Sequence, residues 1–298
     1  MLDVAVIGCG IVGANVAYLL SQHKLRAAVF EKENDVSMGT TRANSAIVHA
    51  GYDPEPGTAM ARLNVRGSAL TKEQCAAFDV KYRQIGSLVL AFSDEEMATV
   101  RRLYENGVAN GVPGVRVLTR EETLAMEPNL SDAVCGALYA PSAAIVEPWD
   151  LALALAEAAV ENGVELHLET AVTGAEKISG GWRLHTAKGD FEARAVVNAA
   201  GVEADLVAAM AGEPGFTTIP SRGEYYLLDK SQGYVVNHVV FQCPNRDGKG
   251  VLVSPTVHYN LIVGPNAEPS GREDVSTQAD ALAFVREKAV KSVPGVNF

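Results

Sequence analysis

The fold is decided near the start of the chain, where Val4 to Gly13 read VAVIGCGIVG. The apolar run Val4–Ile7 ends in a glycine, as buried parallel strands commonly do, and apolar residues then recur at helical spacing. Gly8, Gly10 and Gly13 form the pattern GxGxxG between this strand and this helix. The first glycine permits a tight turn, the second lets the backbone approach a pyrophosphate, and the third lets helix and strand pack closely. The stretch therefore predicts a dinucleotide-binding unit.

A second apolar run, Ala27–Phe30, ends at Glu31. A carboxylate at this place can accept hydrogen bonds from the ribose hydroxyls of an adenosine, and it disfavours the 2′-phosphate of NADP. The start of the helix, at Ile11 and Val12, offers N–H groups and the positive end of the helix dipole to phosphates. A lone GxGxxG also occurs in turns that bind nothing, but here strand, helix, strand and acid follow in register. The pattern leaves FAD and NAD as alternatives.

The next segment, Gly39–Tyr52, reads GTTRANSAIVHAGY and is dense in small and hydroxyl-bearing residues. Such a stretch can place hydroxyls and backbone N–H groups on a pyrophosphate while its small residues pass close to a flat ring. A polar surface loop is the alternative reading, but the apolar run Ala46–Val48 argues against it. The segment therefore favours FAD over NAD.

The amino-acid composition limits which binding partners and which cellular compartment fit the protein. Lysine and arginine number 25 against 36 aspartate and glutamate, and the net charge of −11 argues against nucleic acid or an anionic membrane as the main partner. No apolar stretch has the length of a transmembrane helix, although peripheral membrane contact stays open. The four cysteines are scattered without a CxxC pattern, so no metal site is expected and a reduced, cytoplasmic protein fits best.

The order of elements predicts an α/β protein with two interleaved domains. Expected helices cover residues 57–79, 94–110, 119–126, 149–162 and 275–292. Expected strands cover residues 87–92, 164–168, 171–178, 182–187, 191–198, 217–228, 234–241, 250–254 and 259–263. Ser93 and Thr119 stand where they can cap the second and third of these helices, and Glu122 completes a capping box with Thr119.

Taken together, the motifs resemble the D-amino-acid oxidase (DAO) superfamily of FAD oxidoreductases. The resemblance rests on GxGxxG, on Glu31-Lys32, and on the stretches TTRANSAIVHAGYDP, SRGEYYLLD and PTVHYNLIVGPNAE. Within the superfamily the chain is most similar to the branch that holds FAD-dependent glycerol-3-phosphate dehydrogenases and L-2-hydroxyglutarate oxidases. The likeness runs through essentially the whole chain, and the combination of motifs is far more specific than any one of them.

The resemblance implies a Rossmann-like FAD-binding domain of the glutathione-reductase type with an interleaved α+β substrate domain. We expect the FAD-binding domain at 1–82 and 145–212 and the substrate-binding domain at 83–144 and 213–274. The remainder, 275–298, is expected to form a helix that returns to the FAD-binding domain. No stretch after Gly264 resembles the family's final strand and glycine-rich turn, so we expect weak flavin retention and little turnover.

The resemblance also implies which residues hold FAD. Thr41, Asn44 and Ser45 are expected at the pyrophosphate or ribityl chain, and Val172 is expected to meet the adenine through its backbone. Ala200 and Gly201 correspond to a later small-residue turn near the cofactor. The full expected set is Gly8, Gly10, Ile11, Val12, Gly13, Glu31, Lys32, Thr40, Thr41, Asn44, Ser45, Val172, Ala200 and Gly201.

Oxidising an alcohol with a flavin needs a C–H bond aimed at flavin N5, a base for the hydroxyl proton, and a clamp for the rest of the substrate. His49 is the first candidate base, because an imidazole titrates near neutrality. A structural histidine that caps a turn, or a covalent flavin tether, is the alternative role for His49. His258 is the competing base.

Arg222 is the candidate clamp, because a guanidinium holds a carboxylate or phosphate through two parallel hydrogen bonds. Pairing of Arg222 with Glu224 across a solvated strand face is the alternative. Tyr52 could close the pocket, and Thr256 could line it together with His258 from a shared strand face.

The sequence thus predicts an enzyme that oxidises a small anionic hydroxy substrate by hydride transfer to FAD. The expected substrate is glycerol 3-phosphate or a 2-hydroxy acid such as L-2-hydroxyglutarate, with an unassigned electron acceptor. Two alternatives stay open. One is an amine or amino-acid oxidase on the same scaffold, and the other is a non-catalytic FAD-binding fragment that needs a partner chain.

Overall fold

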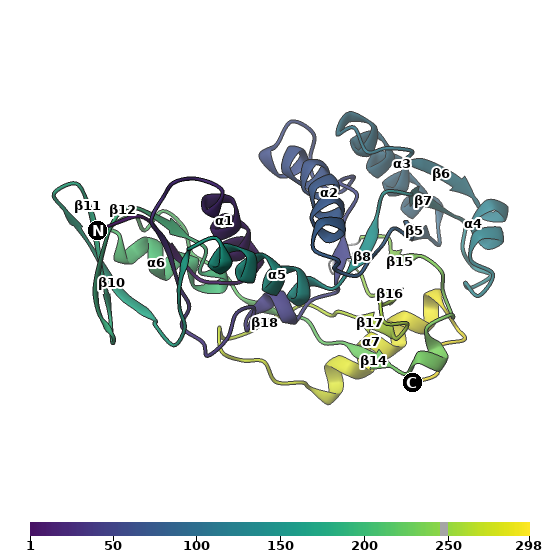
Figure 1. Cartoon of the computed structure of the whole chain (residues 1–298). Helices are drawn as coiled ribbons and strands as arrows, with labels where there is room; N and C mark the ends of the chain where they lie inside the picture. Colours follow the sequence, from purple (N-terminus) through teal and green to yellow (C-terminus); the bar gives the residue numbers. More distant parts are fainter. Residues whose placement is uncertain (245–249) are drawn as a thin grey trace. The chain divides into compact units, whose positions relative to one another are not determined.

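The computed structural model describes residues 1–244 and 250–298 (Figure 1). Contacts divide the chain into two compact units. Unit 1 comprises Met1–Asn44 and Pro148–Pro220, and unit 2 comprises Ser45–Glu147 and Ser221–Phe298. Residues 45–82, expected with the FAD-binding domain, are grouped with unit 2.

Unit 1 is built on one six-stranded sheet. Four strands run parallel in the order β12-β1-β2-β9, and β11 and β10 continue the sheet in antiparallel fashion beyond β12. This arrangement confirms the predicted α/β class. The strands are β1 (Leu2–Ile7), β2 (Ala27–Phe30), β9 (Glu165–His167), β10 (Val172–Ile178), β11 (Gly181–Thr186) and β12 (Gly189–Asn198).

Helices cover the parallel strands of unit 1. α1 (Ile11–Ser21) and α5 (Pro148–Glu161) pack side by side (Figure 1), while α6 (Ala204–Met210) packs against β10 and β12. α5 begins at a proline, where the missing N–H costs no hydrogen bond. The core of the sheet holds small residues beside Phe30, so that the helices can approach the strands closely.

Unit 2 contains a seven-stranded sheet in the order β14-β17-β16-β15-β5-β7-β6, with a three-stranded sheet β3-β8-β4 and a two-stranded pair β13-β18. The helices of this unit are α2 (Ala59–Ala77), α3 (Asp94–Ala109), α4 (Arg120–Met126) and α7 (Ala279–Ser292). The strands are β3 (Ile47–Val48), β4 (Tyr82–Arg83), β5 (Ser87–Ala91), β6 (Arg116–Thr119), β7 (Gly136–Ala140), β8 (Ala144–Val146), β13 (Ser221–Arg222), β14 (Tyr226–Leu228), β15 (Val239–Gln242), β16 (Leu252–Pro255), β17 (Leu261–Gly264) and β18 (Glu268–Pro269).

The predicted helix caps are confirmed. The Ser93 hydroxyl accepts the N–H of Glu96 at 3.2 Å at the start of α3. At the start of α4 the Thr119 hydroxyl accepts the N–H of Glu122, and the Glu122 carboxylate accepts the N–H of Thr119. These bonds satisfy backbone donors that have no acceptor inside a helix.

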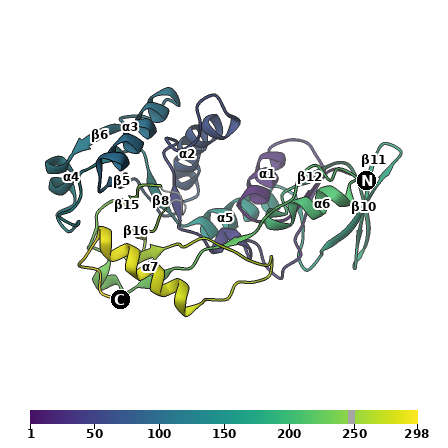
Figure 2. The ribbon, with the colours of Figure 1, turned by 180° about the vertical axis from the view of Figure 1, so that it is seen from behind.

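Two stretches differ from expectation. The strand expected at 217–228 is broken into β13 and β14, because its two parts pair with different strands, β13 with β18 and β14 with β17. Between them the Gly223 backbone lies against Pro265, where an added Cβ would come within 2.6 Å of that ring. The C-terminal helix α7, expected to return to the FAD-binding domain, is grouped with unit 2. It packs against β17 (Figure 1), and Val285 and Ala289 are fully buried in the core of unit 2. Figure 2 shows α7 from the opposite side.

A buried carboxylate ties α4 to the start of β15. The Glu127 side chain accepts the backbone N–H groups of Asn237 and His238, both at 2.7 Å, and lies 2.6 Å from His238 Nδ1. Glu127 has no exposed surface. Removing it would leave several buried donors without an acceptor, a cost much greater than that of losing an exposed ion pair.

We therefore expect Glu127→Ala to lower the free energy of unfolding by about 3 kcal/mol, since each buried donor left without an acceptor costs about 1–3 kcal/mol. Urea unfolding followed by circular dichroism measures it. Glu105→Ala on the exposed face of α3 is the matched control and should stay within about 0.5 kcal/mol of the parent. Equal effects of the two variants would contradict this role for Glu127.

Candidate functional site

The GxGxxG turn has the tight geometry that its glycines predict. Gly8 follows β1 with φ +96°, and its N–H donates to Phe30 O at 2.9 Å. A Cβ on Gly13 would lie 1.9 Å from Gly8 O, and a Cβ on Gly8 would lie 2.5 Å from Ala199 O. Helix α1 therefore starts in direct contact with the end of β1, which only glycine permits.

The turn is braced by two side chains from elsewhere in unit 1. The Thr41 hydroxyl accepts the N–H of Ile11 at 3.0 Å and lies where a Cβ on Gly10 would come within 3.0 Å of it. The Glu31 carboxylate accepts the N–H of Cys9 at 2.7 Å and that of Glu33 at 3.0 Å. Each carboxylate oxygen can accept a further hydrogen bond, so Glu31 can still receive a ribose hydroxyl.

The ends of β1, β2 and β12 meet at one edge of the sheet. Ala199 donates its N–H to Ile7 O at 2.9 Å, which places the small-residue turn Ala200–Gly201 beside the glycine turn. Gly201 has φ +58° and opens the 3-10 helix η2 (Gly201–Glu203). Ligands of open α/β sheets bind outside the carboxyl ends of the parallel strands. The structure thus brings these predicted residues together.

Three further residues predicted to bind the cofactor, Lys32, Thr40 and Val172, also belong to unit 1. Lys32 forms an ion pair with Glu203 at 2.9 Å, and this hydrogen bond is the main reason that the pKa of Lys32 is raised. Thr40 is exposed in the 3-10 helix η1 (Thr40–Arg42), where its carbonyl accepts from the Asn44 side chain at 3.0 Å. Val172 begins β10 next to a bulge.

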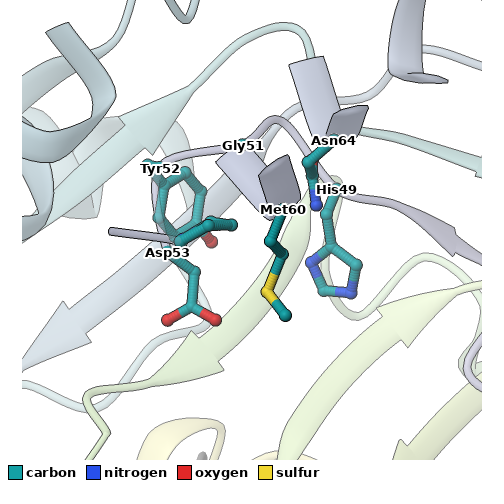
Figure 3. A pocket seen from close by; sticks show the side chains of 7 residues that line it. His49, Gly51, Tyr52, Asp53, Met60 and Asn64 are labelled. Carbon is teal, nitrogen blue, oxygen red and sulfur yellow. The ribbon is translucent and has the colours of Figure 1, made fainter. Parts of the chain in front are cut away.

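The candidate base belongs to unit 2. His49 follows β3 and stacks on Phe241, with the two ring centroids 5.7 Å apart. It lines a shallow cavity of about 90 Å³ (Figure 3). Figure 3 shows the Met60 side chain reaching between the His49 imidazole and the Asp53 carboxylate. The cavity is lined by His49, Gly51, Tyr52, Asp53, Pro54, Met60 and Asn64.

Tyr52 forms the inner wall of this cavity. Its ring is buried in the core that surrounds Val100 and Leu138, and this burial raises the pKa of its hydroxyl above the ordinary value. The Cβ that an alanine at Gly107 would add lies 3.2 Å from Tyr52 Cβ, so α3 packs tightly behind it. Tyr52 is therefore a fixed wall of the pocket and stays protonated at neutral pH.

The candidate clamp Arg222 is engaged by acidic side chains. Its Nε lies 3.0 Å from Glu224 Oε1, its Nη1 bonds to Asp274, and its Nη2 lies 3.7 Å from Glu268 Oε2. Glu224 is itself buried and accepts the N–H of Gln278 at 2.9 Å. This arrangement favours the alternative role, in which Arg222 pairs with Glu224, except that the two side chains are only 13% and 2% exposed and so do not form a solvated face. The pairing also holds the segment around Asp274 against β13.

Thr256 and His258 do not share a strand face as expected, because both lie in the turn after β16. The Thr256 hydroxyl accepts the N–H groups of His258 and Asn260, at 3.2 and 3.1 Å. His258 Nε2 lies 2.8 Å from Glu147 Oε2, and its Nδ1 lies 3.2 Å from Lys81 Nζ. Both side chains are thus engaged in holding the turn.

The sequence profile of one protein family, described as FAD dependent oxidoreductase (DAO), matches residues 3–297. The chain belongs to the DAO family of FAD-dependent oxidoreductases. Its cofactor is accordingly FAD. The turn has no room for a Cβ at Gly8 or Gly13, so helix α1 starts close against β1, and this tight glycine turn at a helix start fits the approach of a diphosphate to the backbone.

Three relatives illustrate the range of the family. The chain is 48% identical over 98% of its length to a glycerol 3-phosphate dehydrogenase from Caloramator mitchellensis, and it spans 61% of that protein. It is 32% identical to the L-2-hydroxyglutarate dehydrogenase of Escherichia coli, covering 90% of this chain and 64% of that one. The solved L-alpha-glycerophosphate oxidase from Mycoplasma pneumoniae with FAD bound superposes with a TM-score of 0.93 at 30% identity, covering 99% and 79% of the two chains.

Several residues of this DAO-family chain were not anticipated. Met60 and Asn64 reach the His49 cavity from α2, and Asp53 precedes that helix. No sequence signal singles out Met60, because its helical spacing suggests a buried apolar residue, whereas 70% of its surface is accessible in the structure. Among the described residues there is no group of three or more His, Cys, Asp or Glu side chains placed to hold a metal. Within the same residues no helix is long and apolar enough to span a membrane.

The contact between Gly13 and Gly8 gives the first test of the cofactor site. We expect Gly13→Ala to push α1 away from β1, because the new Cβ has no room. FAD affinity should fall at least tenfold and stability by about 1–3 kcal/mol, as for an overpacked core. Fluorescence titration with FAD and thermal unfolding measure both. Gly67→Ala in the open part of α2 is the control and should leave FAD affinity unchanged. Its stability should stay equal or rise by about 0.5–1 kcal/mol.

The thiol inside the turn gives a second test. Cys9 is 1% exposed, and burial, with the charges of Glu31 and Asp35 adding to it, raises its pKa to about 12. Since only the thiolate is a good nucleophile, Cys9 should resist alkylation at neutral pH. Treatment with iodoacetamide followed by mass spectrometry should modify the exposed Cys135 first and Cys9 only after unfolding. Equal labelling of both in the folded protein would show that the turn is open.

Proposed function

We propose that this chain carries the FAD site and the catalytic base of an enzyme that oxidises a small anionic hydroxy compound. Glycerol 3-phosphate is the first candidate substrate, and a 2-hydroxy acid such as L-2-hydroxyglutarate is the second. The observation that carries the proposal is the 48% identity, over 98% of this chain, to a protein named glycerol 3-phosphate dehydrogenase. The expected cytoplasmic location stays a prediction.

In this proposal unit 1 binds the nucleotide half of FAD. The N-terminal end of α1 faces the diphosphate, because the first N–H groups of a helix have no intrahelical acceptor. Glu31 accepts hydrogen bonds from the adenosine ribose, and Ala200–Gly201 borders the same edge of the sheet. Glu31 is held by two backbone N–H groups, so its carboxylate is oriented before the ligand binds.

His49 is the proposed base. When bound, FAD supplies the oxidant, because the flavin ring accepts the two electrons of the C–H bond. The chain must then remove the hydroxyl proton of the substrate, and a ring nitrogen of His49 takes it. Two observations support this role: His49 borders a cavity, and its ring is restrained by stacking on Phe241.

Arg222 is not included as a clamp, because its acidic partners already surround it. To hold a substrate anion, Arg222 would have to leave the buried carboxylate of Glu224 without its cation, which is costly.

A substrate panel tests the proposal. Anaerobic mixing of the FAD-loaded protein with glycerol 3-phosphate, L-2-hydroxyglutarate, lactate, glycine and sarcosine, followed by absorbance, reports which compound reduces the flavin. We expect bleaching by glycerol 3-phosphate or a 2-hydroxy acid. Bleaching by glycine or sarcosine alone would replace the proposal with amine oxidation. A chain that holds FAD and is bleached by none of the panel would instead support a non-catalytic FAD-binding fragment.

Two variants separate the proposed roles. His49→Ala should slow flavin reduction by about 10²–10⁴-fold, the usual contribution of a general base, and leave FAD affinity nearly unchanged. Glu31→Ala should raise the FAD dissociation constant by about 10–100-fold, since hydrogen bonds to a charged group contribute about 1.5–3 kcal/mol. The controls are the exposed variants His23→Ala and Glu157→Ala. The reverse pattern, with FAD lost in His49→Ala and reduction slowed in Glu31→Ala, would overturn this assignment.

A further inference from the structure

The cavity beside His49 has a fixed wall. All the residues that line it belong to unit 2. The Asn110 side chain, just after α3, holds the lining loop Gly51–Pro54: its amide nitrogen donates to Gly51 O at 2.9 Å and to Pro54 O at 2.8 Å. Backbone carbonyls only accept hydrogen bonds, so the direction of both bonds is fixed. The loop therefore keeps its shape without a contribution from unit 1.

Helix α2 contributes the two other lining residues, Met60 and Asn64. They stand four residues apart, on one face of the helix, and both side chains extend toward His49 (Figure 3). Thr58 fixes the start of α2, because its hydroxyl accepts a backbone N–H of the first turn at 3.2 Å. The helix also lies close to the loop, since a Cβ on Gly51 would come within 3.3 Å of Asn64 Oδ1. The position of Asn64 is thus set from both sides.

The Asn64 side chain carries an oxygen atom without a partner. Within the described residues, Asn64 Oδ1 is buried and accepts no hydrogen bond. Leaving a buried acceptor unpaired is costly, and native proteins commonly satisfy such a group with a water molecule or a ligand. The last torsion of an asparagine side chain is broad, so a rotation presents either end of the amide to the cavity. Either end can bind a hydroxyl, which both donates and accepts.

The cavity offers no cationic side chain of lysine or arginine to an anion. Neither residue type occurs among the described residues that line it, and the Asp53 carboxylate lies across Met60 from His49 (Figure 3). A phosphate or carboxylate placed here would meet a like charge and would give up water without gaining a partner. A hydroxyl is neutral and finds the Asn64 amide. The cavity therefore suits a neutral, hydroxylated end of a small molecule.

We propose that Asn64 is a specificity-determining residue: its amide binds a hydroxyl on the carbon next to the one that is oxidised, while the anionic group of the substrate lies outside this cavity. The inference rests on the proposed function, in which His49 removes the proton of the oxidised alcohol. It names the substrate class as a vicinal diol, such as glycerol 3-phosphate. A 2-hydroxy acid fits less well, because a carboxylate stands next to its oxidised carbon.

A substrate analogue combined with a variant tests the proposal in the FAD-loaded full chain. The analogue is 2-hydroxypropyl phosphate, which keeps the phosphate and the oxidisable hydroxyl of glycerol 3-phosphate but lacks the terminal hydroxyl. In the parent, kcat/KM should be about tenfold lower for the analogue, because one hydrogen bond is lost. Asn64→Leu keeps the shape of the side chain and should lower kcat/KM about tenfold for glycerol 3-phosphate only. The variant should then treat the two compounds alike.

Asn106→Leu is the matched control. Asn106 is also a half-buried asparagine in a helix of unit 2, but it does not line the cavity. This variant should keep the tenfold preference for glycerol 3-phosphate. Equal losses for both compounds in Asn64→Leu would overturn the proposal. So would a parent that does not distinguish the compounds, an arm that needs no variant, or an equal effect of Asn106→Leu.

Nuclear magnetic resonance on the FAD-free chain separates this proposal from the proposed function, because the cavity is lined by unit 2 alone. Glycerol 3-phosphate should shift the side-chain amide signal of Asn64 and leave that of Asn106 in place, and 2-hydroxypropyl phosphate should shift neither. An unmoved Asn64 signal would overturn the role of Asn64, even if glycerol 3-phosphate reduces the flavin. A shifted signal without flavin reduction by any hydroxy compound would instead overturn the proposed function and leave the hydroxyl-binding role standing.

Discussion

The contact between the start of α1 and the end of β1 is the constraint on which the nucleotide site depends. With no Cβ at Gly13, the helix begins against the Gly8 carbonyl, and with φ +96° at Gly8 the chain turns sharply enough to let it do so. The ends of the neighbouring strands then lie beside the helix start, so Glu31 and the turn after β12 reach the same edge of the sheet. A helix set further out would separate these groups.

Much of unit 1 could be predicted from the sequence because its signals are local. Glycine spacing, an apolar strand and a terminal acid specify a turn whose parts lie within about one βαβ unit. The caps at Ser93 and Thr119 are equally local, since each side chain bonds to a backbone group only three residues away. Local sequence signals therefore predicted both the glycine turn of unit 1 and the starts of α3 and α4 in unit 2.

The parts that escaped prediction depend on contacts between distant residues. Arg222 has the side chain of an anion clamp, but it contacts Asp274 and Glu268. The sequence does not show that the segment carrying these two acids folds back onto Arg222. His258 was expected on a strand, and its actual partner Glu147 is equally remote along the chain. The division of the chain into FAD-binding and substrate-binding domains stays a prediction, although the contacts group residues 45–82 with unit 2.

The bracing of Glu31 has a consequence for altering nucleotide preference. Its carboxylate is at once the proposed ribose acceptor and the acceptor for the N–H groups of Cys9 and Glu33. A cationic side chain at this position could bind the extra phosphate of another dinucleotide. It would also remove the acceptor of two backbone N–H groups that holds the glycine turn in place. Re-engineering the loop for another dinucleotide thus requires a second residue that restores those two lost acceptor contacts, and a single charge reversal is not enough.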